Sequence, residues 1–195
     1  MKRFISLLII FLTFSVFVFA QDADENDGFE DDVYVYTSNG AGDQFLKINL
    51  GAVFPLNFKG QLKTGGKASI GYFKFFSETF AVGGELAATY SISIGEKVLV
   101  MLPMTFGVMF QPYIGRFEFP MYAEVGMANQ TWQNMEIFPT LATKLSAGAY
   151  FRITDAVSVG VSTDFLWLPQ WFIKQPSKNF NGLFETAEIG LRYHF

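Results

Sequence analysis

The chain has 195 residues and a formal net charge of −4, and it is 50% hydrophobic, 18% aromatic and only 16% charged. The charged share lies well below the roughly 25% of an ordinary soluble domain, which argues against that class. After residue 20, charges and glycines interrupt every apolar run before the roughly 20 residues that a spanning helix needs, which excludes a helical membrane protein.

Residues 1–20 have the pattern of a signal peptide. Lys2 and Arg3 form a basic start, Phe4–Phe19 is apolar, and Val18 and Ala20 stand where a signal peptidase requires small residues. The apolar run is near the upper length for a signal peptide, so an uncleaved inner-membrane anchor is the alternative. Cleavage would remove two positive charges and take the formal charge from −4 to −6.

Residues 21–43 are predicted to be an acidic, flexible leader in the periplasm. Its carboxylates have almost nothing apolar among them to bury, which favours a solvated segment. A calcium site is the alternative, but the spacing lacks the ligand positions and the distal glutamate of an EF-hand loop. The carboxylates are Asp22, Asp24, Glu25, Asp27, Glu30, Asp31 and Asp32.

From Gln44 onward, apolar and polar residues alternate with a period of two, which predicts β-strands. Leu46 and Ile48 share one face of the first strand, and Lys47 and Asn49 share the other. Eight strands are predicted, at 44–54, 67–76, 80–94, 98–110, 116–128, 140–153, 156–167 and 183–195. Tight turns at 77–79, 111–115 and 154–155 alternate with longer loops at 55–66, 129–139 and 168–182. The prediction is an all-β fold, an eight-stranded antiparallel up-and-down transmembrane β-barrel over residues 44–195.

The composition of the two strand faces indicates which face meets lipid. The apolar face of the middle strands carries no charge, whereas the opposite face is mostly Gly, Ala, Ser and Thr with single charges. Small residues suit the interior of a narrow barrel. A lysine or arginine at mid-bilayer on the lipid face would cost roughly 2–4 kcal/mol. A lipocalin-like barrel with an apolar interior is the alternative, but it needs a well-charged exterior. We therefore predict lipid outside.

The last strand carries a resemblance. The chain ends in GLRYHF, in which Leu191, Tyr193 and Phe195 alternate and finish on an aromatic residue. Together with the signal peptide and the strand pattern, residues 44–195 resemble the small eight-stranded outer-membrane β-barrels of diderm bacteria, the group that includes OmpA, OmpX and OmpW. The resemblance implies a location in the outer membrane and contact with its lipid. It also implies that a barrel-insertion machinery reads Leu191, Tyr193 and Phe195 as an assembly signal.

The polar face, taken as inward, places four positive and five negative side chains in the lumen. One interpretation is a selectivity filter or gate, in which Arg152 or Arg192 changes carboxylate partners. The other is a static ion-paired plug, which is favoured because eight strands leave hardly more room than side chains need. The nine residues are Lys47, Glu85, Glu118, Glu124, Lys144, Arg152, Asp164, Glu188 and Arg192.

Pro103 and Pro120 both fall inside predicted strands, where a barrel has no free edge for a missing N–H. Counted from the turn at 111–115, they would face each other across the fourth and fifth strands. The resemblance to OmpW suggests a lateral gap there for a small hydrophobic solute, and the alternative is a bulge that only shapes the barrel. The neighbouring inward positions are unusually apolar: Leu99, Met101, Met109 and Tyr122.

Lysines concentrate in or beside the long loops, where they suit contacts with anionic head groups or a surface ligand, although a solvated loop is the simpler interpretation. They are Lys59, Lys63, Lys67, Lys174 and Lys178. Aromatic residues beside the same loops, such as Trp132, Trp167 and Trp171, suit either membrane anchors or ligand contacts.

Catalytic and cofactor chemistry has little support. The chain has no cysteine, which excludes thiol nucleophiles, disulfides and cysteine metal sites. Its one histidine, His194, lies at the tight-turn end, whereas the barrel hydrolases of the resembling group carry a histidine–serine arrangement at the outer rim. We expect no enzymatic activity, cofactor, metal or nucleic-acid partner. The predicted function is an integral outer-membrane barrel with a charged, largely plugged lumen and a structural or surface-interaction role. The alternative is a narrow OmpW-like porin or transporter for small, including hydrophobic, solutes.

Overall fold

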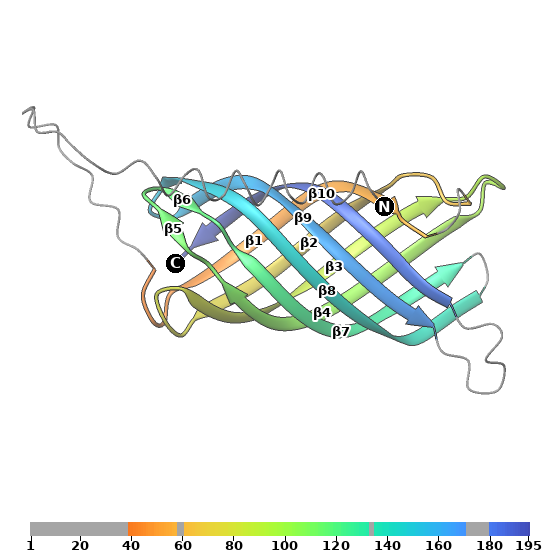
Figure 1. The fold of residues 1–195 in the computed structure, drawn as a ribbon, viewed down its shortest axis with the longest axis horizontal. Helices are drawn as coiled ribbons and strands as arrows, with labels where there is room; N and C mark the ends of the chain where they lie inside the picture. The colour runs from red at the N-terminus through yellow and green to blue at the C-terminus, as the bar shows by residue number, and fades with distance from the viewer. Residues whose placement is uncertain (1–38, 58–60, 133–134, 171–179) are drawn as a thin grey trace, which may run out of the picture. The chain divides into compact units, whose positions relative to one another are not determined.

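The computed structural model describes residues 39–57, 61–132, 135–170 and 180–195, and its strands form one antiparallel sheet (Figure 1). The signal peptide and most of the acidic leader predicted from the sequence lie outside these residues. The eight long strands are β1 (Gln44–Pro55), β2 (Gly65–Phe75), β3 (Phe80–Ile92), β4 (Val98–Phe110), β7 (Met121–Trp132), β8 (Met135–Thr154), β9 (Val157–Gln170) and β10 (Phe180–His194). Among the described residues, no helix has the length and apolar character needed to cross a membrane.

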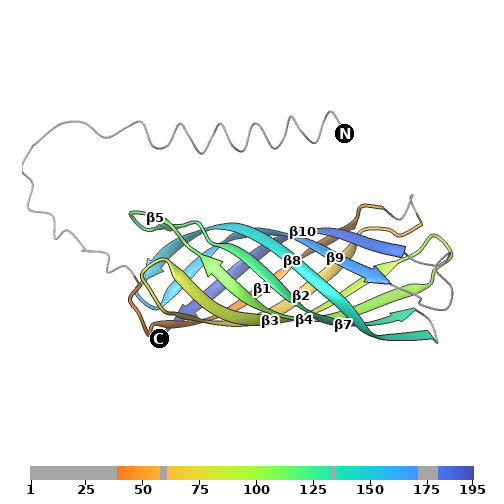
Figure 2. The ribbon, with the colours of Figure 1, turned by 60° about the horizontal axis from the view of Figure 1, so that its bottom comes forward.

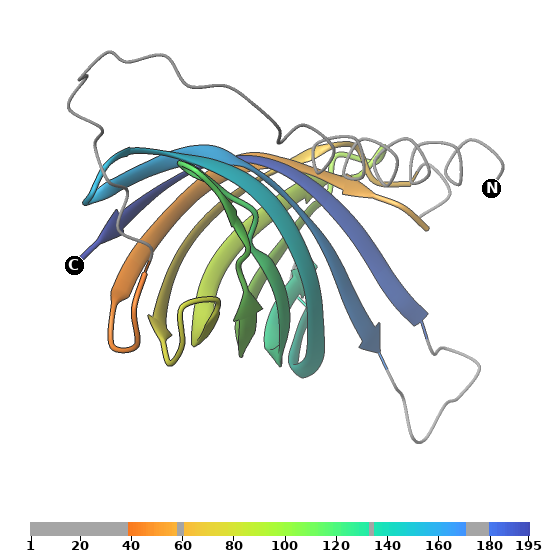
Figure 3. The ribbon, with the colours of Figure 1, turned by 60° about the vertical axis from the view of Figure 1, so that its left-hand side comes forward.

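The sheet closes into a barrel. β1 pairs with both β2 and β10, and β8 pairs with both β7 and β9, so each long strand has two neighbours. Figures 2 and 3 show the long strands running at a slant around the barrel. A closed ring leaves no free sheet edge, which is the condition for β-structure in hydrocarbon. The predicted all-β, eight-stranded antiparallel barrel is confirmed.

The strand alternation separates the two faces of the wall. On β1, the side chains of Ile48 and Leu50 are 52% and 55% exposed, whereas that of Lys47 between Leu46 and Ile48 is buried. The same alternation runs through β2, β3 and β4. The outside is thus an apolar band and the polar positions point inward, as a membrane-spanning barrel requires.

The loop predicted at 129–139 is wrong. β7 continues to Trp132 and β8 already begins at Met135, and these two residues pair with each other. The β-branched and aromatic residues in this stretch favour strand over loop. The β7–β8 hairpin is therefore longer than the sequence pattern predicted.

Residues 111–120 do not form the predicted tight turn. They form a small hairpin of β5 (Tyr113–Ile114) and β6 (Phe117–Glu118), between which Gly115 adopts a φ of 56° that glycine tolerates. β6 then pairs with β8. The strand predicted at 116–128 is split into β6 and β7, because Pro120 has no N–H to donate to the ladder.

The hairpin also changes the register between β4 and β7. Pro103 lies opposite Ala128, and the pairing runs along Leu99–Phe110 without a register shift. The predicted opposition of Pro103 and Pro120 is therefore wrong, and so is a gap or bulge between these two strands at Pro103. The cause is the hairpin, which is longer than the five-residue turn assumed from the sequence.

Candidate functional site: the barrel lumen

All nine charged residues predicted for the lumen lie inside the barrel and are buried. Seven lumen residues form what we call the central network: Lys47, Lys67, Glu85, Glu124, Lys144, Asp164 and Glu188. A second group, which we call the mouth cluster, lies toward the tight-turn end and comprises Gln111, Glu118, Arg152, Arg192 and His194.

Glu85 of β3 is the hub of the central network. Its carboxylate lies 2.5 Å from Lys47 Nζ, 2.8 Å from Lys144 Nζ and 3.1 Å from Lys67 Nζ. The Lys144 ammonium also lies 2.5 Å from the Glu124 carboxylate. One carboxylate thus holds three ammonium groups that would otherwise repel one another, in a low-dielectric interior where both effects are strong.

Lys67 joins the hub to two further carboxylates, those of Asp164 and Glu188, the latter 2.6 Å from Nζ. Glu188 also accepts hydrogen bonds from Asn49 Nδ2 at 2.9 Å and from the Thr186 hydroxyl at 2.7 Å. The extra donors occupy oxygen lone pairs that the lysine leaves open, which a buried ion pair needs to be stable.

From the sequence, Lys67, the first residue of the predicted strand 67–76, is expected among the lysines in or beside the loops, and the structure places it in the lumen instead. Its side chain is only 4% exposed, because β2 begins at Gly65 and its inward positions include Lys67, Ser69 and Phe73. The signal was present, since Lys67 shares the parity of these residues. Adding it to the four predicted cations gives five positive and five negative charges inside the described barrel, so the formal charges balance.

Arg192 is the centre of the mouth cluster and is completely buried. Its guanidinium stacks on the Tyr150 ring, with 3.6 Å from Cζ to the ring centroid. Its nitrogens donate to Gln111 Oε1 at 2.8 Å and to the Tyr122 hydroxyl at 2.5 Å. A planar, forked donor group that also stacks on an aromatic ring is what arginine offers and lysine does not.

Glu118 connects the two arginines of the mouth cluster. One carboxylate oxygen lies 3.3 Å from Arg152 Nη1, and the other lies 3.3 Å from Arg192 Nη1. Glu118 occupies this position because β6 pairs with β8 and turns its side chain inward. The β5–β6 hairpin, which the sequence did not predict, thus places the Glu118 carboxylate in the lumen.

Asn39 closes the same end of the barrel. It is buried, accepts from Arg152 Nη1 at 2.8 Å, and donates to the Tyr113 hydroxyl at 2.9 Å. The Tyr113 hydroxyl in turn donates to the Glu78 carbonyl at 2.7 Å. Nothing in the local sequence distinguishes Asn39 from the leader to which it was assigned, so this contact could not be predicted.

His194 lies in the mouth cluster beside a serine. Its Nε2 is 3.0 Å from the Ser158 hydroxyl and 4.0 Å from Glu118. Ser158 is completely buried, and His194 is buried as well. In the described part of the chain, no group of three or more His, Cys, Asp or Glu side chains is arranged to hold a metal ion.

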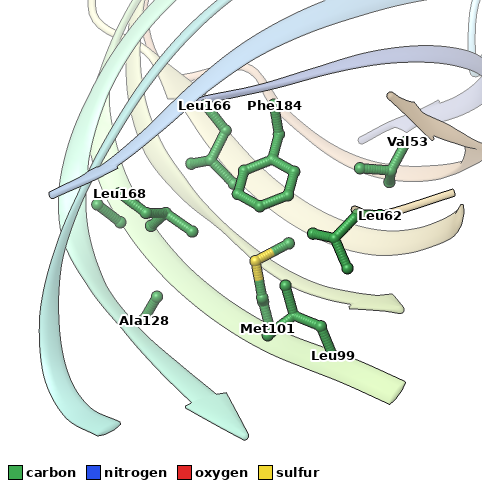
Figure 4. Packing of buried hydrophobic residues seen from close by; sticks show 9 residues of the cluster. Val53, Leu62, Leu99, Met101, Ala128, Leu166, Leu168 and Phe184 are labelled. Carbon is green, nitrogen blue, oxygen red and sulfur yellow. The ribbon is translucent and has the colours of Figure 1, made fainter. Parts of the chain in front are cut away.

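Apolar side chains pack inside the barrel on both sides of the central network. Toward the tight turns, rings and a methionine pack together as Phe45, Phe73, Phe75, Ala81, Met109 and Tyr122. Toward the long loops, Figure 4 shows Leu99, Met101, Leu166 and Phe184 converging with their neighbours on a common space. Leu62 joins this second cluster because its segment bridges to Ser93 beside β3.

Little free volume remains beside the network. A cavity lined by Lys67, Glu85, Met101 and Pro103, among others, measures about 10 Å³. That is approximately the space that one water molecule needs. Side chains therefore fill nearly all of this cavity.

The residues predicted as an assembly signal lie outside the lumen. The side chains of Leu191, Tyr193 and Phe195 are 44%, 51% and 57% exposed, and the rings of Tyr193 and Phe195 stack at 6.1 Å. The Phe195 N–H donates to the Gln44 carbonyl at 2.9 Å. The last residue thus contributes to the seam between the first and last strands.

The chain is similar to known proteins in sequence and in fold. A protein-family model matches residues 22–193. An uncharacterized protein of Treponema pallidum (strain Nichols) is 27% identical over 181 residues, covering 84% of this chain and 82% of the relative. The crystal structure of Neisserial surface protein A matches with a TM-score of 0.61 at 8% identity, covering 79% of this chain and 99% of its own. That of the outer membrane protein OprG from Pseudomonas aeruginosa matches with a TM-score of 0.52 at 11% identity, covering 81% and 98%.

At these identities the likeness to solved structures concerns the fold, and the family match covers most of the chain. The chain therefore belongs to the family whose model spans residues 22–193, and its fold is that of the small eight-stranded outer-membrane β-barrels.

Proposed function

We propose that this protein is an integral outer-membrane β-barrel with a closed lumen, and that its role is structural or lies in surface interactions. The observation that carries the proposal is the balanced set of five cations and five carboxylates that are buried in the lumen among the residues the structure describes. Breaking one such pair leaves an uncompensated buried charge, which costs roughly 3–5 kcal/mol. The cations and carboxylates therefore hold one another in place, and the apolar clusters on both sides keep bulk water out.

Lipid of the outer membrane is the proposed partner of the exterior. The apolar band, for example Phe106 at 64% and Val161 at 57% exposure, has no favourable contact with water. The predicted signal peptide is consistent with export. We propose no catalytic role, since the buried Ser158 and His194 lack an accessible path to substrate.

Conductance in a planar bilayer tests the closed lumen. We expect purified wild-type protein to give no large, stable channels, because the cavity beside the network holds about one water. The double variant Lys67→Ser, Glu188→Ser removes one cation and one carboxylate and should raise the current. The matched variant Lys63→Ser, Glu96→Ser makes the same chemical change at exposed positions and should leave the current at the wild-type level. Large, ion-selective channels from the wild type would overturn the plug and favour the narrow transporter.

We also propose that the insertion machinery reads the last strand through Leu191, Tyr193 and Phe195. Deletion of Phe195 should lower the yield of folded barrel in outer-membrane fractions, because it removes an exposed ring and the backbone bond to Gln44. Heat-modifiable migration on a gel measures the folded fraction. Phe195→Tyr keeps both features and should fold normally, whereas normal yield of the deletion would count against the proposed signal.

A further inference from the structure

A groove of about 770 Å³, open to the outside, lies on the wall over β2, β3 and β4 and reaches Asn129 of β7. Ala68 and Ala88, which pair across β2 and β3, form its floor. The next outward row, Ile70, Leu86 and Met104, forms one side, and these side chains are 48–50% exposed. Two methyl groups thus lie at the bottom of a hollow walled by long aliphatic side chains.

The wall beneath this groove is interrupted on one edge of β4. The pairing of β3 with β4 runs to Leu86 opposite Met104 and resumes at Thr89 opposite Met101, with no pair at the intervening positions. Pro103 lies in this interval and has no N–H to donate to β3. The interstrand ladder and the outer side-chain cover are therefore both reduced at the same place.

The groove does not lead into the lumen. Ala87 lines both the groove and the small lumen cavity, so only the strand itself separates the two spaces. The lumen side offers about 10 Å³, approximately the space for one water molecule. A molecule in the groove has nowhere to go inward, so the geometry describes a binding site and not a passage.

We propose that this groove binds one acyl chain of a membrane lipid. The proposal rests on the membrane location proposed above. The groove is continuous with the lipid-facing band, and seven of its nine lining residues are apolar, Ser69 and Asn129 being polar and none charged.

The shape favours a lipid chain over a second copy of the barrel. Close association in membranes needs small residues that let two backbones approach. Here Ala68 and Ala88 lie below the level of Leu86 and Met104, so a neighbouring wall cannot reach them, whereas a narrow, flexible chain can. An unfilled hollow would forfeit dispersion contacts along its whole lining.

Photo-crosslinking in vesicles tests the site. The wild-type barrel is reconstituted in phosphatidylcholine that contains a trace of phosphatidylcholine with a diazirine at mid-chain, and crosslinked peptides are identified by mass spectrometry. We expect crosslinks to concentrate on β2–β4. Ala68→Leu, Ala88→Leu fills the groove and should abolish this concentration. Ala52→Leu, Ala187→Leu, at another alanine pair between neighbouring strands, should preserve it.

The outcomes separate the site from the membrane location. Even labelling of all strands, or labelling unchanged by the filled groove, would overturn the acyl-chain site while leaving the membrane location intact. Absence of lipid crosslinks from every strand would contradict the location itself. Protein–protein crosslinks between barrels that the filled groove abolishes would assign the groove to a second copy and overturn the lipid site.

Discussion

Replacing Glu85 with alanine is expected to lower the free energy of unfolding by about 3–5 kcal/mol, the cost of removing one partner from a buried ion pair. Without this carboxylate, the ammonium groups of Lys47, Lys67 and Lys144 lose the anion that they share at 2.5–3.1 Å. Urea titration of the barrel folded in lipid vesicles, followed by tryptophan fluorescence, measures the loss.

Two variants show whether the loss comes from the charge network. Glu185→Ala makes the same change at a partly exposed position and should be nearly neutral. Glu85 is the ion-pair partner of Lys47 at 2.5 Å, so adding Lys47→Met to Glu85→Ala should recover part of the stability. A loss below about 1 kcal/mol, as in exposed pairs, would mean that Glu85 does not hold the network together.

The second large effect is expected for Arg192→Ala, which should also cost about 3–5 kcal/mol because the buried Glu118 carboxylate loses one of its two cations. Glu118 would keep only Arg152 as an ion-pair partner, and Tyr122 and Gln111 would lose a charged donor. The same titration measures the effect, and a fall in the heat stability of the folded form on a gel should accompany it.

Arg192→Lys separates charge from geometry. Lysine keeps the positive charge but cannot stack on Tyr150 while donating to both Gln111 and Tyr122. We expect it to recover only part of the loss, and Lys74→Ala, at an exposed position, to have little effect. Wild-type stability of Arg192→Lys would show that the stability does not depend on the guanidinium's stacking and paired hydrogen bonds.

The architecture could be predicted because a membrane barrel imposes one rule on every wall strand. β4 occupies the predicted residues 98–110, since seven outward apolar side chains alternate with small or apolar inward ones without a break. The same rule identified nine of the ten charged residues that are buried in the described part of the lumen. Lys67 was missed because the glycines before it resemble a loop, although its parity matched the inward face.

The parts that could not be predicted depend on contacts between distant segments. The β5–β6 hairpin exists through its pairing with β8, and Asn39 is fixed by Arg152, 113 residues away in the sequence. The aromatic cluster at Phe45, Phe73 and Tyr122 occupies inward positions that the rule assigns to polar residues. These rings replace water next to the arginine, where cation–π contacts are stronger because the site is desolvated.

The central claim, lipid outside and a plugged lumen within, is tested most directly by cysteine accessibility at two consecutive positions. Because the chain has no cysteine, Ser69→Cys and Ile70→Cys each introduce a single thiol, one facing the lumen and one facing outward. In vesicles, a charged, water-soluble maleimide should label neither variant, although both should react in urea and an exposed Lys63→Cys should react throughout. Labelling of Ser69→Cys in the folded barrel would show an open lumen, and labelling of Ile70→Cys would show water where the account places lipid.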